Sequence, residues 1–176
     1  MRDTRDNRTN EQFQSNLEFY QTAEDEILRQ WKKLEYERHG RLIECRRVEP
    51  YEAGVLVDCV ECMPDFQIRA LPNGVWHYLE VKEVDREPPY LTLKTHQLKA
   101  YQKYNAYILL VYGTNRKATG EFSSETKWAI ISPHAYSEWL ATRPSLYYSC
   151  YPHCTSVRIF ECEWKQYFTW QDWKIF

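Results

Sequence analysis

The amino-acid sequence predicts an α/β protein in which helices flank a mixed central β-sheet. Apolar residues recur at helical spacing between residues 22 and 40, which is typical of an amphipathic helix. Asn73-Gly74 separates two runs of β-branched and aromatic residues, a strong signal for a β-hairpin whose turn uses positive φ. Residues 106–112 form a continuous apolar run, as expected for a strand buried on both faces.

The composition favours one globular domain. The chain has 176 residues and a formal net charge of only −2, which argues against a general electrostatic attraction to nucleic acid. Basic residues cluster at Arg41, Arg46 and Arg47 and along residues 94–103, but such runs are equally typical of solvated faces. No apolar run could cross a membrane, and the N-terminus lacks the apolar core of a signal peptide. We therefore expect no membrane association and a cytoplasmic location, in the host cytoplasm if the chain is viral.

The predicted organisation has three parts. Residues 1–20 are polar and without periodicity, which predicts a flexible N-terminal arm. Residues 21–140 carry the alternating helix and strand patterns of the core. Residues 141–176 form an aromatic, cysteine-containing extension that we expect to pack on the core.

Local signals place the elements of the core. Thr22 is suited to cap the first helix, whose first turn is acidic, and Gly40 is suited to end it. A second helix is predicted at residues 92–104. A short third helix is predicted through Trp139 and Leu140, with Ser132 as its cap and Pro133 at its first position. The predicted strands cover residues 42–45, 55–62, 63–68, 75–82, 106–112 and 127–132.

Charged residues converge on the predicted hairpin. Because side chains alternate along a strand, Glu80 and Lys82 share one face with Trp76 and Tyr78, while Leu79 and Val81 point into the opposite, buried face. Asp65 lies on the partner strand and comes within reach of Glu80 when the hairpin folds. Two carboxylates are costly to bury unless they bind a hard cation, which prefers oxygen ligands.

These residues resemble a known signature. Pro64-Asp65 followed by Glu80-Val81-Lys82 is similar to the motif of PD-(D/E)xK nucleases, the restriction-endonuclease-like superfamily. Over residues 22–132 the resemblance implies an αβββαβ core and hydrolysis of DNA phosphodiester bonds. It also implies one or two Mg²⁺ ions, or Mn²⁺, bound by Asp65, Glu80 and the Val81 carbonyl. Lys82 would then orient or activate the attacking water.

Two further segments resemble parts of that superfamily. Residues 23–31 are similar to the first helix of the junction-resolving endonuclease of T-odd phages, which implies that Glu24, or else Glu26, contributes to the metal site. Gln97 and Tyr101 resemble the Q-x-x-x-Y motif of RecB-like nucleases, whose two side chains help to position DNA. The alternative for the helix is simple, since acids in a first turn stabilise a helix by themselves.

The six cysteines allow three interpretations. The first is that all are small buried hydrophobes, which we prefer. The second is a structural Zn²⁺ site, for which the spacing offers Cys59, Cys62, Cys150 and Cys154, with His153 or Cys162 as substitutes. The third, implied by the RecB-like resemblance, is an iron–sulfur cluster on Cys45, Cys150, Cys154 and Cys162. Disulfides become an option if the source is a hyperthermophile or its virus.

Three functions remain open from the sequence. The first is a Mg²⁺-dependent DNA endonuclease of phage, mobile-element or repair and recombination type, which could be selective for branched DNA and act as a homodimer. The second is a RecB-like DNA exonuclease, suggested by Gln97 and Tyr101. The third is a nuclease-like fold that binds DNA or a protein partner without catalysis, which suits the acidic balance.

Overall fold

The fold is known from a computed structural model. It describes residues 10–48, 51–52, 55–56, 63–84, 90–112, 126–141, 146–148, 155–160 and 169–173. The central sheet has six strands in the order β1-β4-β5-β7-β8-β11. Their bounds are Ile43–Arg47, Phe66–Ala70, His77–Val84, Tyr107–Tyr112, Lys127–Ile131 and Gln171–Asp172. β5 and β7 pair in parallel and the other neighbours pair antiparallel, so the predicted mixed sheet is confirmed.

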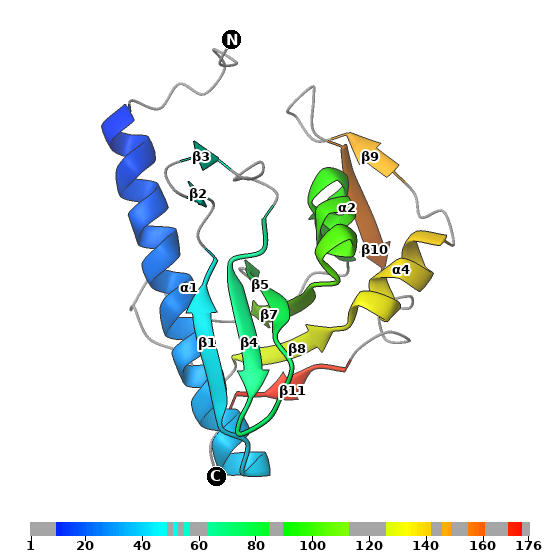
Figure 1. Ribbon diagram of the computed structural model, residues 1–176. Coiled ribbons are helices and arrows are strands. Elements are labelled where there is room, and N and C mark those ends of the chain that lie inside the picture. Colours follow the sequence, from blue (N-terminus) through cyan, green and yellow to red (C-terminus); the bar gives the residue numbers. More distant parts are fainter. Residues whose placement is uncertain are drawn as a thin grey trace.

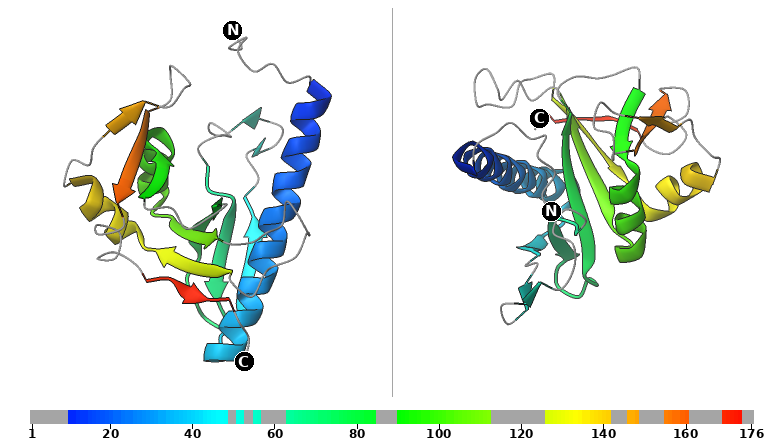
Figure 2. Two further views of the ribbon diagram at one scale, coloured as in Figure 1. Left: turned by 180° about the vertical axis from the view of Figure 1, so that it is seen from behind. Right: turned by 90° about the horizontal axis from the view of Figure 1, so that it is seen from above.

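Helices cover both faces of this sheet (Figures 1 and 2). α1 (Asn10–His39) lies along one face, while α2 (Thr95–Tyr104) and α4 (Pro133–Ala141) lie on the other. β7 is buried between the two layers. Leu109 and Val111 pack in the cluster beneath α1, and Ile108 and Leu110 pack in the cluster beneath α2 and α4. The continuous apolar run of the sequence is therefore a strand buried on both faces, as predicted.

Apart from three strands that belong to smaller sheets, the chain runs through α1, β1, β4, β5, α2 and β7, which is the αβββαβ core predicted from the sequence. Two smaller sheets accompany it. β6 (Tyr90–Lys94), β10 (Thr155–Phe160) and β9 (Leu146–Tyr148) form a three-stranded sheet, and β2 (Tyr51–Glu52) pairs with β3 (Val55–Leu56). Among the described residues, no helix is both long and apolar enough to span a membrane.

Several predicted boundaries were wrong. α1 begins at Asn10 rather than near Thr22, because residues 10–21 contain helix-forming Glu, Gln and Leu and neither Pro nor Gly. α2 begins at Thr95 rather than at residue 92, because the preceding residues pair with the distant strand β10. Of the strand predicted at 55–62, Val55–Leu56 is a strand and 57–62 lie outside the described residues. The division into arm, core and extension stays a prediction.

The hairpin between β4 and β5 is confirmed, but its predicted turn geometry was wrong. Among the described residues, positive φ occurs at Gly40 and Asn105, and at neither Asn73 nor Gly74. The Gly74 amide instead donates to the Ala70 carbonyl oxygen at 2.7 Å, and a Cβ on Gly74 would overlap the Ala70 backbone. Gly74 is therefore required for a close approach of the two chain segments.

We expect Gly74→Ala to destabilise the fold by about 2 kcal/mol, because the added methyl group forces the hairpin backbone apart. Urea denaturation measures this change, with Gly40→Ala as a comparison. Gly40 has open space around its Cβ position but a φ of 65°, so its replacement tests backbone strain alone. Equal stability of Gly74→Ala and wild type would contradict the assigned close approach.

Candidate active site

The hairpin brings Asp65 to β5. Asp65 directly precedes β4, which pairs with β5 through Phe66 and Leu79. Its Oδ2 accepts a hydrogen bond from the Val81 backbone N–H at 3.1 Å. Leu79 and Val81 pack in the cluster beneath α1, as the strand alternation predicted. Asp65 and Glu80, 15 residues apart in the sequence, are therefore neighbours in the fold.

Glu80 is a buried carboxylate whose two oxygens differ in their hydrogen bonding. Only 3% of the residue is exposed. Its Oε1 accepts a hydrogen bond from the Tyr101 hydroxyl at 2.6 Å and forms an ion pair with Lys82 Nζ at 2.5 Å. Its Oε2 is buried and has no hydrogen-bond partner among the described residues. A buried carboxylate oxygen without a partner is unfavourable, which marks this position as one that is suited to receive a ligand.

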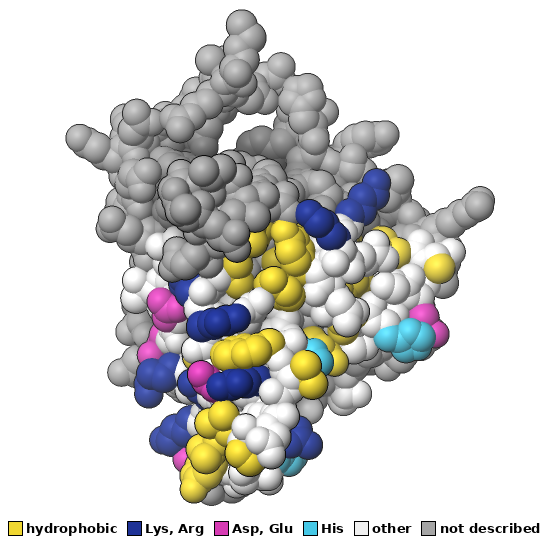
Figure 3. Space-filling view, viewed as in Figure 1, with side chains coloured by type: hydrophobic (Ala, Val, Ile, Leu, Met, Phe, Trp, Pro, Cys, Tyr) yellow, Lys and Arg dark blue, Asp and Glu magenta, His cyan; other side chains and the backbone are white. Residues whose placement is uncertain are grey.

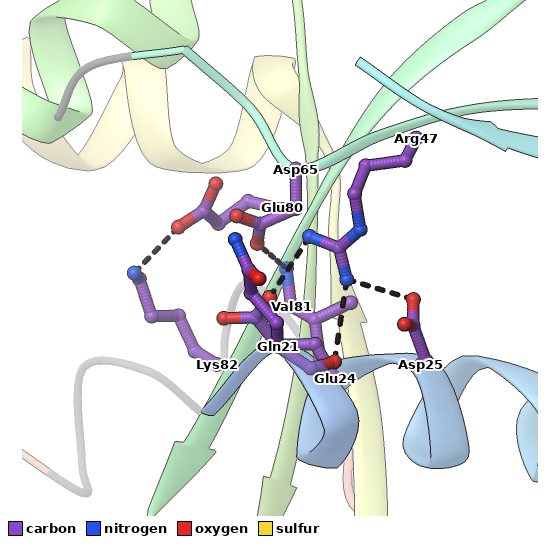
Figure 4. A network of polar contacts seen from close by, with 8 residues as sticks. All are labelled: Gln21, Glu24, Asp25, Arg47, Asp65, Glu80, Val81 and Lys82. Carbon is purple, nitrogen blue, oxygen red and sulfur yellow. Dashed lines mark hydrogen bonds and ion pairs between the residues drawn. The ribbon is translucent and has the colours of Figure 1, made fainter. Parts of the chain in front are cut away.

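α1 supplies Glu24 from the other side of the site. Figure 4 shows Glu24, Asp65, Glu80 and Lys82 gathered around the end of the hairpin. Glu24 Oε2 accepts from the Arg47 guanidinium at 3.3 Å. Glu26 points elsewhere, since its carboxylate binds Arg29 and Gln30 of the same helix. The fold thus brings Glu24, and not Glu26, to the candidate site.

Arg47 also adjoins the site, in a position that no pattern in the sequence indicates. Its guanidinium donates to Glu24 and to Asp25, the latter at 2.7 Å, and lies 4.4 Å from the centre of the Phe66 ring. These contacts join β1 to residues of α1 that lie 23 and 22 positions earlier in the chain, so no local spacing in the sequence could indicate them. Arg47 offsets part of the negative charge and fixes the position of Glu24.

Two carboxylates of the site, those of Asp65 and Glu24, resist ionisation. Burial, followed by the charges of Glu80 and Glu24, raises the pKa of Asp65 to about 8. Burial also raises the pKa of Glu24, against the effect of Arg47. Burial disfavours the charged form of Lys82, but the neighbouring carboxylates, Glu80 above all, raise its pKa overall. The carboxylates of the cluster therefore outnumber the positive charges of Lys82 and Arg47. Such an imbalance is common at functional sites.

The donor set fits a hard divalent cation. Asp65 and Glu80 offer carboxylate oxygens, and one of them, Glu80 Oε2, has no hydrogen-bond partner in the part of the chain that the structure describes. In the described part of the chain, no group of three or more His, Cys, Asp or Glu side chains is arranged to hold a metal ion together. A set of two carboxylates is still appropriate for Mg²⁺, which retains several waters and completes its shell with substrate phosphate.

The predicted DNA-positioning residues lie on α2. Tyr101 is buried and contacts Glu80 directly, so the helix is tied to the candidate site through this hydroxyl. Gln97 is half-buried one turn earlier on the same helix. The roles of both side chains toward DNA stay predictions.

Of the six cysteines, only Cys45 lies within the described residues. It is a free, half-buried thiol on β1, and Lys32 Nζ lies 3.3 Å from its Sγ. The other five lie outside the described residues: Cys59, Cys62, Cys150, Cys154 and Cys162. The zinc, cluster and buried-thiol interpretations therefore stay predictions.

Comparisons with known proteins give similarity to solved structures and none at the level of sequence. No protein-family model and no curated protein matches the chain. Among solved structures, the chain is similar to Hjc, a Holliday junction resolvase from the archaeal hyperthermophile Archaeoglobus fulgidus. The two share 16% sequence identity, the match covers 83% of this chain and 93% of that chain, and the TM-score is 0.44. Junction resolution is the activity of that protein, and the function of this chain depends on the chemistry of its own residues.

Proposed function

We propose that this protein is a metal-dependent DNA endonuclease that hydrolyses phosphodiester bonds. The observation that carries the proposal is the convergence of Asp65, Glu80 and Lys82 at the open end of one hairpin, with a buried Glu80 oxygen that lacks a partner among the described residues. A cluster of this kind is costly for folding alone, since it concentrates carboxylates in a poorly hydrated position. Binding of a cation and a phosphate ester accounts for its arrangement.

Each residue of the site would have its own role in the reaction. Asp65 and Glu80 would hold Mg²⁺ or Mn²⁺, with Glu24 and the Val81 carbonyl as further oxygen donors. When bound, such an ion supplies charge to the scissile phosphate and lowers the pKa of a coordinated water. The Lys82 side chain is 31% exposed, so its ammonium can leave Glu80 to orient the attacking water and stabilise charge on the phosphate. Tyr101 fixes the orientation of Glu80 through its hydroxyl.

An exonuclease is the second candidate. The hydrogen bond between Tyr101 and Glu80 favours an exonuclease. It joins α2, which carries the Q-x-x-x-Y motif that resembles RecB-like nucleases, to the Glu80 carboxylate on β5. Both candidates take DNA as partner, and an endonuclease that cuts paired strands would work as a homodimer.

A cleavage assay tests the proposal. The substrates are labelled linear duplex, single-stranded, flapped and four-way-junction DNA, each incubated with Mg²⁺, Mn²⁺ or EDTA. We expect metal-dependent internal cuts by wild type, and mononucleotide release from ends would favour the exonuclease. If folded wild-type protein binds these DNAs but cuts none of them, the proposal is wrong. The non-catalytic binding function is then the one that is favoured.

The two glutamates of α1 provide a matched comparison. We expect Glu24→Gln to lower the cleavage rate about tenfold or more, because its charge adjoins Asp65 and Glu80. Glu26→Gln makes the same chemical change on a side chain bound within its own helix, and should leave the rate within about twofold. Single-turnover cleavage measures both. Equal rates for the two variants would remove Glu24 from the site.

A further inference from the structure

The face of the central sheet opposite α1 carries a basic surface beside the candidate active site. Arg46 of β1 and Arg69 of β4 project from this face. Their strand neighbours Cys45 and Ile68 point the other way, into the cluster beneath α1. Glu80 of β5 projects from the same face as the two arginines, toward α2. Figure 3 shows basic and hydrophobic side chains alternating over this part of the sheet, on an open face of the molecule.

Two guanidinium groups of this surface contact one aromatic ring. The guanidinium carbon of Arg46 lies 4.5 Å from the centre of the Trp76 ring, and that of Arg69 lies 4.6 Å from the same centre. The two groups differ in their other partners. Arg69 forms an ion pair with Glu44 at 2.6 Å. Within the described part of the chain Arg46 forms no ion pair, and its Nε donates to the side-chain oxygen of Gln67 at 2.8 Å.

Arg46 is therefore an exposed cation that is held in one orientation but is not neutralised. The Trp76 ring and the Gln67 side chain restrict its guanidinium on one side, so it loses little freedom when it binds a ligand. The remaining N–H groups of a guanidinium form a planar fork that matches two oxygens of a phosphate. Arg46 is suited to bind such an anion, whereas the charge of Arg69 is already offset.

The strand register relates Arg46 to the active site. Arg46 lies opposite Gln67, and Gln67 lies opposite Tyr78. Tyr78 precedes Glu80 by two residues on β5, so both side chains share the face from which Arg46 projects. Two residues span about 7 Å along a strand, and neighbouring strands lie about 4.8 Å apart. The backbone positions of Arg46 and Glu80 are therefore about 12 Å apart, a span of roughly three or four nucleotides of duplex DNA.

We propose that Arg46 binds a backbone phosphate of the DNA substrate within a few nucleotides of the bond that is cut, and that Trp76 orients it for this role. The inference rests on the proposed function. Two features favour a DNA strand as the ligand: the positive charge of the surface, and its continuity with a site suited to phosphodiester chemistry. The contact positions the strand without reading its sequence.

DNA affinity gives the first test. Binding of labelled duplex and junction DNA is measured by fluorescence anisotropy across a salt series, with Ca²⁺ in place of Mg²⁺. We expect Arg46→Gln to weaken binding about tenfold and to lower the slope of log affinity against log salt by about 1. Arg46→Lys should keep the slope but bind more weakly than wild type, because it loses the planar fork. Wild-type affinity and slope in Arg46→Gln would overturn the inference. Unchanged DNA affinity with weaker binding of poly-glutamate would assign Arg46 to an acidic protein and also overturn it.

Arg69 provides the matched control, because it contacts the same ring but is neutralised by Glu44. The double variant Arg69→Gln with Glu44→Gln removes this ion pair at constant net charge and should leave the affinity and the slope unchanged. Glu44→Gln alone removes the carboxylate partner of Arg69 and should strengthen DNA binding severalfold. A loss in the double variant as large as that in Arg46→Gln would overturn the inference, because a neutralised arginine would then serve equally well.

The role of Trp76 is tested by a double-mutant cycle. Trp76→Leu should weaken DNA binding severalfold in the wild-type background, because the Arg46 guanidinium loses the ring that orients it. In the Arg46→Gln background the same change should have no further effect. Equal losses in the two backgrounds would show that Trp76 acts independently of Arg46, and would overturn the role assigned to the ring.

Single-turnover cleavage separates this contact from the catalytic centre. Arg46→Gln should raise the half-saturating DNA concentration about tenfold and cleave at the wild-type rate once saturated. A slower reaction at saturation with unchanged affinity would place Arg46 in the chemical step and overturn the inference. If wild type binds DNA through Arg46 but never cuts it, the phosphate contact stands and the proposed nuclease activity falls. If wild type cuts DNA and Arg46→Gln binds it equally well, the nuclease activity stands and the phosphate contact falls.

Discussion

Replacing Asp65 with asparagine should lower metal-dependent DNA cleavage by a factor of about 1,000 or more while making the folded protein more stable at pH 8. The loss of cleavage follows from removing a negatively charged oxygen donor of the proposed cation site, which is worth several kcal/mol. The gain in stability follows from the electrostatics of the metal-free site. Asparagine can still accept the hydrogen bond from the Val81 N–H, so the hairpin contact is retained.

The sign of the stability change comes from the pKa of Asp65. It is about 8 in the fold against an ordinary value of 3.8, because burial and the charges of Glu80 and Glu24 disfavour the carboxylate. The folded state therefore holds a proton that the unfolded state releases. This stabilises the fold at pH 4 and below, and the contribution is lost as the pH rises from 4 to 8. Asparagine cannot ionise, so the variant should be more stable than wild type at pH 8 by on the order of 5 kcal/mol, since each unit of the rise in pKa corresponds to about 1.4 kcal/mol.

Chemical denaturation at pH 5 and pH 8 in EDTA measures the effect, and repeating it with Mg²⁺ adds a binding readout. Wild type should gain stability from Mg²⁺ at pH 8, and Asp65→Asn should gain much less. Glu138→Gln serves as the control, because Glu138 is an exposed carboxylate on α4 paired with His134. Wild-type cleavage by Asp65→Asn would refute the proposed active site. A variant less stable than wild type at pH 8 would refute the electrostatic account.

The parts of the site that were predictable from the sequence are those governed by local periodicity. Alternation along β5 placed Glu80 and Lys82 away from the buried Leu79, and the hairpin signal placed Asp65 beside them. The turn geometry was not predictable in the same way, because Gly74 serves a close approach to Ala70 that only the folded backbone defines.

Local periodicity does not predict which residues far apart in the sequence pair with one another. β6 is a strand because of its partner β10, whose paired residues lie 62 to 70 positions later in the chain, so the local pattern alone favoured an earlier start of α2. The position of Arg47 against Glu24 depends on the packing of α1 on the edge of the sheet. The identity of Glu24 as the glutamate nearest the site could be predicted only through resemblance, since Glu26 has the same chemistry and the same helix.

Replacing Lys82 with methionine should also abolish cleavage but should change stability in the opposite direction. Methionine keeps an apolar stem of similar length and removes the ammonium group that pairs with Glu80 at 2.5 Å. Glu80 would then remain as a buried carboxylate with Tyr101 as its only described hydrogen-bond donor. Removing one partner of such a pair costs about 3 kcal/mol. Cleavage should fall at least about 100-fold, because the group that orients the water and stabilises charge on the phosphate is lost.

The two variants together separate a cation site from a purely structural ion pair. If Asp65 and Glu80 hold the ion, Mg²⁺ replaces the missing lysine charge, so Lys82→Met should recover more stability on adding Mg²⁺ than wild type does. The double variant Lys82→Met with Glu80→Gln provides the reference, because it removes both charges and should lose the response to Mg²⁺. If Lys82→Met is destabilised equally with and without Mg²⁺ while still binding DNA, then Lys82 serves only to neutralise Glu80. The carboxylates of the hairpin would in that case be part of the fold and not of a catalytic centre.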